Sequence, residues 1–187
     1  LATRVADGLG IELPAANPAY REPIDMPASD ALSIQKSMKE TLEGRQVGIL
    51  IADGSDGGEI DAVVKSVEAA GGKAVLVAPK VGGAKLADGS KKKAHGQLAG
   101  SPSQIFDAVA VVLSEEGCKA LLKEGAAVQW VMDAFGHLKA VAANAAAKPL
   151  LDKAGVEPDA GVVDLGQIAT AGTKRYWDRE ANVRTLA

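Results

Sequence analysis

The chain has 187 residues, of which 47% are apolar, and it carries a formal net charge of −3. The length allows one domain of ordinary size plus an appendage, and the charge gives no reason to expect nucleic acid or an anionic membrane as a partner. No run of about 18 apolar residues predicts a membrane span, and the single cysteine, Cys118, is compatible with a soluble, cytoplasmic protein.

The opening of the chain is predicted to be an appendage to the main domain. Residues 1–9 are expected to form about two helical turns, with Leu1, Val5 and Leu9 roughly on one face. So short a helix is not stable alone. Because the chain begins with leucine rather than methionine, we expect it to be a piece of a longer protein.

A proline-rich segment follows this helix. Residues 10–29 contain four of the eight prolines, which predicts a linker lying on a surface. A short helix is expected within residues 30–43, and Gly44 ends it. We therefore assign residues 1–45 to the end of a preceding helical region plus a linker, and residues 46–187 to one α/β domain.

Residues 46–80 predict a β-α-β unit. Residues 47–52 form an apolar run of the length and type expected for a buried strand. Apolar residues then recur at helical spacing until Gly71 and Gly72, which end the helix. A second buried run follows at residues 74–78. Two strands joined by a helix form a parallel pair with a right-handed crossover.

The rest of the chain continues the alternation of strands and helices. Residues 81–101 predict a β-hairpin excursion with Lys91, Lys92 and Lys93 at its tip. The elements expected after it are a strand at 106–113, a helical region from 119 to 138 with a break at Gly125, a strand at 140–143, a helix at 145–154, a strand at 162–163 and a closing helix at 168–183. Together they predict a flavodoxin-like, three-layer α-β-α sandwich with a mostly parallel sheet.

A glycine-rich acidic turn follows the first strand, at the edge where open α/β sheets bind ligands. Backbone N–H groups at a helix start attract anions, but Asp53, Asp56 and Glu59 would repel a phosphate. The glycine spacing also matches neither a dinucleotide fingerprint nor a P-loop. We therefore favour a capping box, in which Asp56 caps the helix and Glu59 reaches back to it.

Few other side chains suggest catalysis or metal binding. The glutamates before Cys118 oppose its ionisation, which favours a structural thiol. Neither His95 nor His137 stands at a recognisable motif spacing from a serine or cysteine. Two histidines and one cysteine are too few soft ligands for a zinc site.

The stretch IADGSDGGEIDAVVKSVEAAGGKAVLVAPKVG resembles the first β-α-β unit of the PfpI-type, class I glutamine amidotransferase-like superfamily. Within that superfamily the whole chain is most similar to the C-terminal domains of large-subunit haem catalases. The matching segments are RVADGLGIELP, the proline-rich link, GAKLADGSKKKAHGQLAGSPS, FDAVAVVLS and KRYWDRE, in this order.

The resemblance implies that no catalytic site survives. The superfamily's hydrolases use a cysteine on a sharp strand-to-helix elbow, assisted by a carboxylate from the first strand-helix turn. Glu59 falls at the carboxylate position, and the nucleophile would align at about Ala145. An alanine supplies no nucleophile, so Glu59 is expected to be vestigial.

The resemblance also implies that haem belongs to a preceding β-barrel domain of the parent enzyme, together with the distal histidine and the proximal tyrosine. Tyr20 and Tyr176 lack the arginine four residues earlier that accompanies the family's haem-ligating tyrosine. This chain alone is therefore expected to bind no haem and no metal, whereas the parent disproportionates hydrogen peroxide to water and oxygen.

The expected function is that of a non-catalytic C-terminal domain that stabilises a tetrameric catalase. Its partners would be the haem-catalase core of the same polypeptide, neighbouring subunits and, in a chaperone-like role, unfolded polypeptides. Two alternatives stay open. One is an autonomous PfpI-type hydrolase or amidotransferase-like enzyme, which Ala145 disfavours, and the other is a small-ligand or redox-sensing module that uses residues 53–59 and Cys118.

Overall fold

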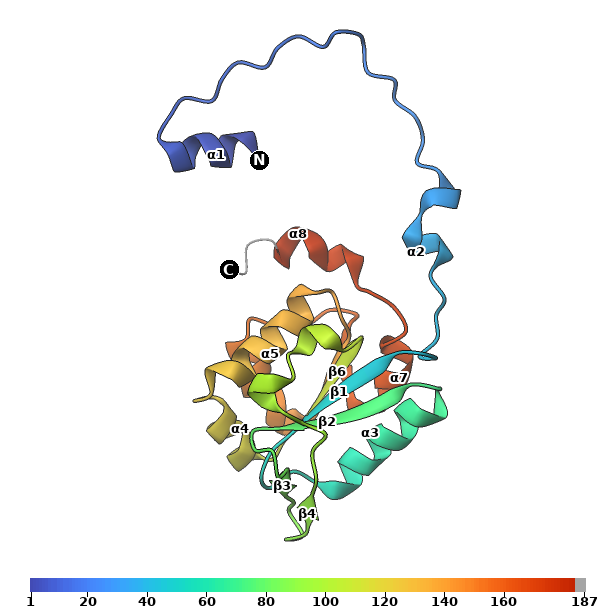
Figure 1. Ribbon diagram of the computed structural model, residues 1–187, viewed down its shortest axis with the longest axis vertical. Coiled ribbons are helices and arrows are strands. Elements are labelled where there is room, and N and C mark those ends of the chain that lie inside the picture. Colours follow the sequence, from blue (N-terminus) through green and yellow to red (C-terminus); the bar gives the residue numbers. More distant parts are fainter. Residues whose placement is uncertain (184–187) are drawn as a thin grey trace. The chain divides into compact units, whose positions relative to one another are not determined.

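The computed structural model describes residues 1–183 of the chain (Figure 1). The chain divides into two compact units, Leu1–Ser37 and a second unit that begins at Met38. The assignment of residues 1–45 to a preceding helical region and linker stays a prediction.

The first unit contains three short helices joined by extended chain. They are α1 (Ala2–Leu9), η1 (Asp30–Leu32) and α2 (Ile34–Ser37). The helix expected within residues 30–43 is thus shorter than predicted and ends at Ser37. The exposed large apolar side chains of this unit are Leu1, Val5, Leu9, Ile11, Leu13, Tyr20, Ile24, Met26, Leu32 and Ile34.

The second unit is built on a parallel sheet with the strand order β5-β2-β1-β6-β7-β8. Its strands are β1 (Gln46–Ile51), β2 (Lys73–Ala78), β5 (Gly96–Gln97), β6 (Ala108–Val112), β7 (Val141–Ala143) and β8 (Val162–Asp164). In the middle of the sheet, Ile49 of β1 pairs with Leu76 of β2 and with Ala110 of β6. Strands β1, β2 and β6 are mostly apolar runs because helices cover both faces of the sheet.

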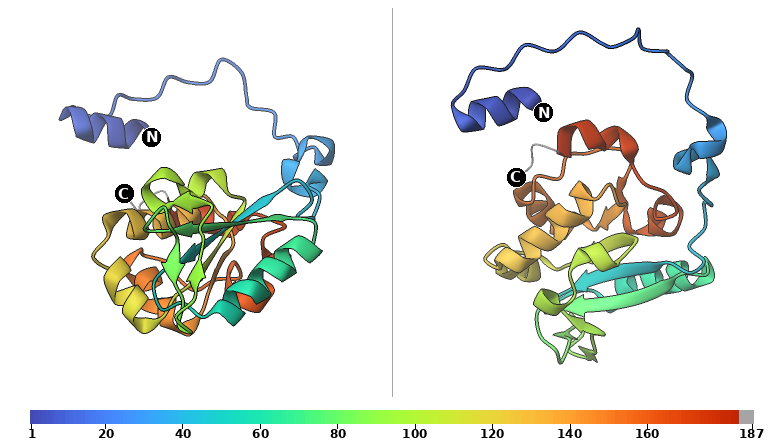
Figure 2. Two further views of the ribbon diagram at one scale, coloured as in Figure 1. Left: turned by 60° about the horizontal axis from the view of Figure 1, so that its bottom comes forward. Right: turned by 45° about the horizontal axis from the view of Figure 1, so that its top comes forward.

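Helices form a layer on each face of the sheet (Figures 1 and 2). One layer contains α4 (Glu115–Leu121), α5 (Gly125–Gly136) and α6 (Lys148–Lys153), and the other contains α3 (Gly57–Ala69) and α7 (Ile168–Ala171). The short helices are η2 (Leu98–Gly100), η3 (Ser103–Ile105), η4 (Ala145–Ala147), η5 (Leu165–Gln167), η6 (Trp177–Arg179) and α8 (Glu180–Val183). The predicted three-layer α-β-α sandwich is confirmed.

The hairpin excursion exists, but its lysines do not form the tip. Strands β3 (Ala84–Lys85) and β4 (Lys91–Lys92) are antiparallel, so the lysines lie on the returning strand. The tip contains Gly89, whose positive φ of 84° suits a tight turn. Lys92 instead pairs with Asp61 on α3.

The closing helix expected at 168–183 is broken into pieces. Helix α7 ends at Ala171, and the chain turns helical again only at η6 and α8. The apolar spacing in this segment suggested one helix. Between the pieces, the side chain of Arg175 bonds to Asp107, which directly precedes β6.

Candidate functional site

The strand order reverses between β1 and β6, and such a switch point is where open α/β sheets bind ligands. Helix α3 leaves β1 on one face of the sheet and α4 leaves β6 on the other. The turns that follow these two strands therefore meet at the carboxyl edge of the sheet, and they form the first place to examine for a site.

Two serine side chains join these turns. Ser55 is fully buried, and its Oγ donates to the carbonyl of Val112 at 2.7 Å. Ser114 caps α4, and its Oγ donates to the carbonyl of Asp53 at 3.2 Å. Only glycine fits at Gly54, because a Cβ there would lie 2.6 Å from the Ser114 Oγ. Hydrogen bonds within the protein thus connect the two turns at the switch point.

Glu59 forms only half of the predicted capping box. The Oδ1 of Asp56 accepts from the backbone N–H of Glu59 at 2.9 Å, as predicted. The Glu59 carboxylate does not reach back to Asp56, because its Oε2 accepts from the Nδ2 of Asn144 at 2.7 Å. The same Nδ2 donates to the carbonyl of Leu113 at 2.8 Å. Asn144 therefore connects the turn after β1 with the ends of β6 and β7.

The turn that carries Asn144 lacks the strained geometry of a nucleophile elbow. Asn144 has a φ of −84° and a ψ of 166°, which is ordinary extended backbone. Among the described non-glycine residues, positive φ occurs at Leu138, outside this turn. Ala145, at the predicted nucleophile position, starts η4 and has only a methyl side chain. The carboxylate of Glu59 thus faces an amide, not a thiol or hydroxyl.

Sequence reasoning did not identify Asn144 as a partner of Glu59. The only available signal was a polar residue directly after a buried strand, at the edge where the carboxyl ends of parallel strands meet.

Small cavities lie at this edge of the sheet, and two of them bear on the sequence candidates. One, of about 330 Å³, lies beside the ends of β7 and β8, where Lys148 and Asp152 form an ion pair at 3.1 Å. The other, of about 210 Å³, lies between the Asp53 turn and α4. Asp53 accepts from the backbone N–H of Lys85 and from Lys80, and these contacts lower its pKa in that order of importance. Each cavity thus has one ion pair in its lining, Lys148 with Asp152 and Lys80 with Asp53.

Of the remaining sequence candidates, Cys118 is buried, whereas His95 and His137 are exposed. Cys118 is 2% exposed, and burial raises the pKa of its thiol, which fits a structural role. His95 accepts from the backbone N–H of Leu76 through Nδ1 at 2.8 Å, and His137 is the C-cap of α5. Among residues 1–183, no group of three or more histidine, cysteine, aspartate or glutamate side chains is placed to hold a metal ion.

Comparison with known proteins identifies the family. The sequence profile of the C-terminal domain found in long catalases matches residues 43–181. The chain belongs to this family. Catalase C of Rhizobium meliloti is 38% identical over 195 residues, which cover 98% of this chain and 28% of that protein. Catalase HPII of Pseudomonas aeruginosa is 32% identical over 195 residues, which cover 100% of this chain and 27% of that protein.

This catalase C-terminal domain thus spans just over a quarter of the length of these curated relatives. Solved structures show its fold. Toxoplasma gondii DJ-1 matches with a TM-score of 0.58 at 12% identity, covering 76% of this chain and 96% of that one. A two-domain protein of Anabaena variabilis with DJ-1/ThiJ/PfpI-like and ferritin-like domains matches with a TM-score of 0.56 at 20% identity, covering 62% and 34%. The predicted superfamily fold is confirmed.

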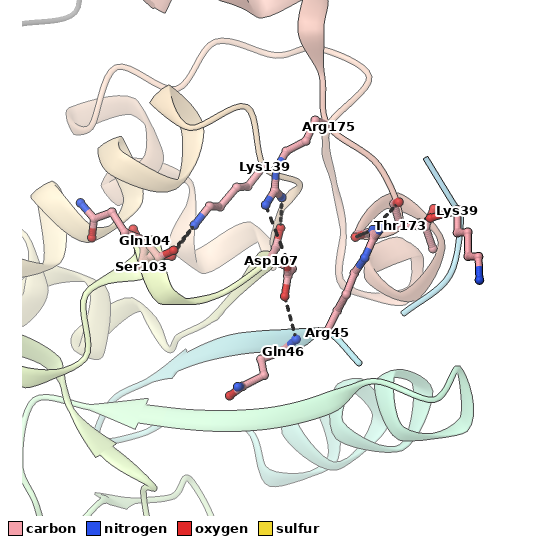
Figure 3. Close-up of polar contacts among 10 residues, drawn as sticks. Lys39, Arg45, Gln46, Ser103, Gln104, Asp107, Lys139, Thr173 and Arg175 are labelled. Carbon is pink, nitrogen blue, oxygen red and sulfur yellow. Dashed lines mark hydrogen bonds and ion pairs between the residues drawn. The ribbon is translucent and has the colours of Figure 1, made fainter. Parts of the chain in front are cut away.

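A second polar cluster of the catalase C-terminal domain lies at the opposite, amino edge of the sheet (Figure 3). Lys139 is 3% exposed, and its Nζ donates to the carbonyls of Ser103 at 2.7 Å and Gln104 at 3.0 Å. Burial, and then repulsion from Arg175, lowers the pKa of Lys139 to about 8. Sequence reasoning gave Lys139 no role, because nothing in its local pattern distinguishes it from a surface lysine.

Arg179 fastens the C-terminal segment of the domain to this edge. It is 4% exposed and bonds to both carboxylate oxygens of Asp159, at 2.6 and 2.8 Å. Its NH1 donates to the carbonyls of Phe135 and Lys139, and the guanidinium lies 3.9 Å from the centre of the Phe135 ring. Burial alone would raise the pKa of Asp159, but hydrogen bonds from Arg179 and Gly161 together lower it. The motif KRYWDRE thus contains a structural anchor.

Within the part of the chain that the structure describes, no helix is both long enough and apolar enough to cross a bilayer.

Proposed function

We propose that this chain is the non-catalytic C-terminal domain of a long catalase and that it stabilises the tetrameric parent enzyme. The parent would disproportionate hydrogen peroxide to water and oxygen with a haem held outside this chain. The observation that carries the proposal is the match of residues 43–181 to a domain found in long catalases. The curated relatives named above are catalases, and each is more than three times as long as the matched region.

The absence of catalysis in the domain itself is proposed from the contacts of Glu59. Covalent acyl transfer requires an activated nucleophile within hydrogen-bond reach of a general base. The group at that distance from Glu59 is the side-chain amide of Asn144, and the next residue is Ala145. We therefore propose that Glu59 is a vestigial carboxylate, which disfavours a PfpI-type hydrolase or amidotransferase-like enzyme.

We propose that neither Tyr20 nor Tyr176 ligates haem. The hydroxyl of Tyr176 donates to the carbonyl of Ala171 at 3.0 Å in a buried position. Tyr20 is fully exposed in the first unit, and the Nδ1 of His95 is occupied by the backbone of Leu76. Iron coordination by Tyr176 would require breaking its hydrogen bond and opening the fold around it. Haem is therefore proposed for the preceding domain of the parent.

The first unit supports the proposed association with a catalase core and with neighbouring subunits. Most of the exposed large apolar side chains among the described residues lie in Leu1–Ser37. Ordering such a segment costs roughly 1–2 kcal/mol per residue in backbone entropy, which its few apolar groups cannot offset alone. We propose that the core of the same polypeptide supplies the missing surface. The same side chains favour a second role, the holding of unfolded polypeptides in the cytoplasm.

The main test compares the complete parent enzyme with a version that ends before Leu1. Both should disproportionate peroxide at 25 °C, but the truncated enzyme should lose activity faster on heating and dissociate from the tetramer at low concentration. The isolated 187-residue chain should show no turnover and no Soret shift on haem titration. Equal thermal half-lives, or a saturable Soret shift of the isolated chain, would refute the proposal.

The second role is tested by the aggregation of a heated client protein. The chain should suppress this aggregation, and a variant with serine at Val5, Leu9 and Ile11 should suppress it less. Serine at Val81, which is exposed in the second unit, is the matched control. Equal suppression by all three proteins would remove the link to the first unit.

A further inference from the structure

Two exposed apolar side chains stand at the amino edge of the sheet. Ile105 is 60% exposed and Trp177 is 41% exposed, although both belong to the well-packed second unit. Ile105 lies in the segment 103–107 and Trp177 in the segment 173–179. We refer to these two segments together as the amino-edge surface.

Hydrogen bonds join the two segments into one surface (Figure 3). Lys139 contacts both, because its Nζ donates to the carbonyl of Gln104 and its own carbonyl accepts from Arg179 at 2.9 Å. Arg175 adds a direct link by donating to the carbonyl of Asp107. These bonds fix the backbones of the two segments relative to each other.

This arrangement uses buried charge, which is costly in a small domain. Among the described residues, the buried charged side chains are Lys139 and Arg179, and both support the amino-edge surface. Burying a charge costs several kcal/mol unless its hydrogen bonds are satisfied, and the bonds that satisfy these two cations also fix the geometry of the segments they join. Hydrogen bonds of this kind, from buried cations to the backbone, are expected beneath a surface that must keep its shape for docking.

The residues on either side of Trp177 are held by hydrogen bonds. The residue before it, Tyr176, is fixed by the bond from its hydroxyl to Ala171, and Arg179 follows two residues later with its paired guanidinium. A tryptophan on a backbone that is already fixed loses less entropy on docking than one on a mobile segment, and tryptophan is enriched among residues that dominate interface energies.

The chain enters the second unit beside this surface. The segment that begins at Met38 leads directly into the amino end of β1. Arg45 ties it down by donating to the carbonyl of Lys39 at 2.9 Å and to the carbonyl of Thr173. Whatever precedes Met38 in the polypeptide is therefore tethered next to the amino-edge surface, which raises its effective concentration there.

We propose that the amino-edge surface, anchored by Trp177 and Ile105, docks onto the haem-carrying core of the same polypeptide. This inference rests on the function proposed above and adds the face of the domain that makes the contact. The carboxyl edge, with Glu59 and Asn144, would then face away from the core.

The test uses the complete parent enzyme with Trp177→Ser, Ile105→Ser or the control Val81→Ser. Val81 is 78% exposed and follows β2 at the opposite edge of the sheet. In the parent, Trp177→Ser should increase the rate of protease cleavage within the domain by about ten-fold or more, since loss of an interface anchor typically has an effect of this order. Val81→Ser should leave that rate unchanged.

Two further measurements separate docking from folding. In the isolated chain all three variants should unfold at the temperature of the unsubstituted chain, and the chain should be monomeric. Hydrogen exchange of residues 103–107 and 173–179 should be slower in the parent than in the isolated chain. Equal exchange in both, an equal effect of Val81→Ser, or a dimer of the isolated chain that Trp177→Ser dissociates would overturn the inference. If removal of the whole domain leaves the parent's half-life unchanged, the proposed function itself fails.

Discussion

Replacement of Arg179 by alanine is expected to lower the free energy of unfolding by about 3–5 kcal/mol. The guanidinium makes two hydrogen bonds to Asp159 and two to the backbone carbonyls of Phe135 and Lys139, and it is almost completely buried. Truncation leaves the Asp159 carboxylate, whose side chain is 31% exposed, without its cation. It also removes packing on the Phe135 ring. A domain has a total stability of roughly 5–15 kcal/mol, so the loss should be large.

Urea unfolding of the 187-residue chain at pH 7, followed by circular dichroism, measures this loss. Lys148→Ala is the matched control, because its ion pair with Asp152 is exposed and should contribute less than about 0.5 kcal/mol. Because the pKa of Asp159 lies below its ordinary value of 3.8 in the folded chain, the pair stabilises above that pH and its contribution disappears as the pH falls through the lower value. A loss of unfolding free energy below about 1 kcal/mol at pH 7 would refute this reasoning. So would a difference in unfolding free energy between the two chains that stays equally large in acid.

Three further outcomes are expected. Because burial lowers the pKa of Lys139 to about 8, the unfolded chain binds more protons between pH 8 and 10.5. Over that range the free energy of unfolding of the unsubstituted chain should rise relative to that of Lys139→Met, by up to about 1.4 kcal/mol per pH unit. Urea titrations of both chains at several pH values measure this difference, and a difference that does not change with pH would contradict the expectation. Gly83→Ala should open the hairpin, because its Cβ would lie 1.9 Å from the carbonyl oxygen of Lys92. Gly89 has a similar positive φ without a clash, so Gly89→Ala should lower the free energy of unfolding by only about 1 kcal/mol. Hydrogen exchange of the hairpin amides distinguishes the two. Cys118 should react with a thiol reagent no faster than the chain unfolds, and rapid alkylation of the native chain would favour a redox module.

Local sequence patterns were sufficient for the central β-α-β unit. The run at residues 47–52 is apolar throughout because both faces of β1 are covered, and its strand lies within one residue of the predicted position. Asp56 caps α3 as predicted, since capping involves only neighbouring residues. The pattern was misleading for the closing helix, where the stretch between α7 and η6 carries a bond from Arg175 to Asp107, 68 residues away.

The partner of Glu59 could not be predicted from local pattern. The capping box was a reasonable prediction, because Asp56 lies three residues away and the geometry of a first helical turn allows it. Asn144 is 85 residues away along the chain and becomes a neighbour only when β7 joins the sheet beside β6. The same holds for Lys139, whose burial depends on the loop at residues 103–104 that folds over it.

The sequence by itself determined the family, the alternation of strands and helices, and the absence of a nucleophile at Ala145, because residue type, apolar spacing and ordered motifs are properties of the chain alone. The tertiary structure decided which polar groups meet, including Glu59 with Asn144 and Arg179 with Asp159. The physical reason is that the burial of apolar residues follows from local pattern, whereas the partner of a buried polar group is any donor or acceptor that folding brings within about 3 Å.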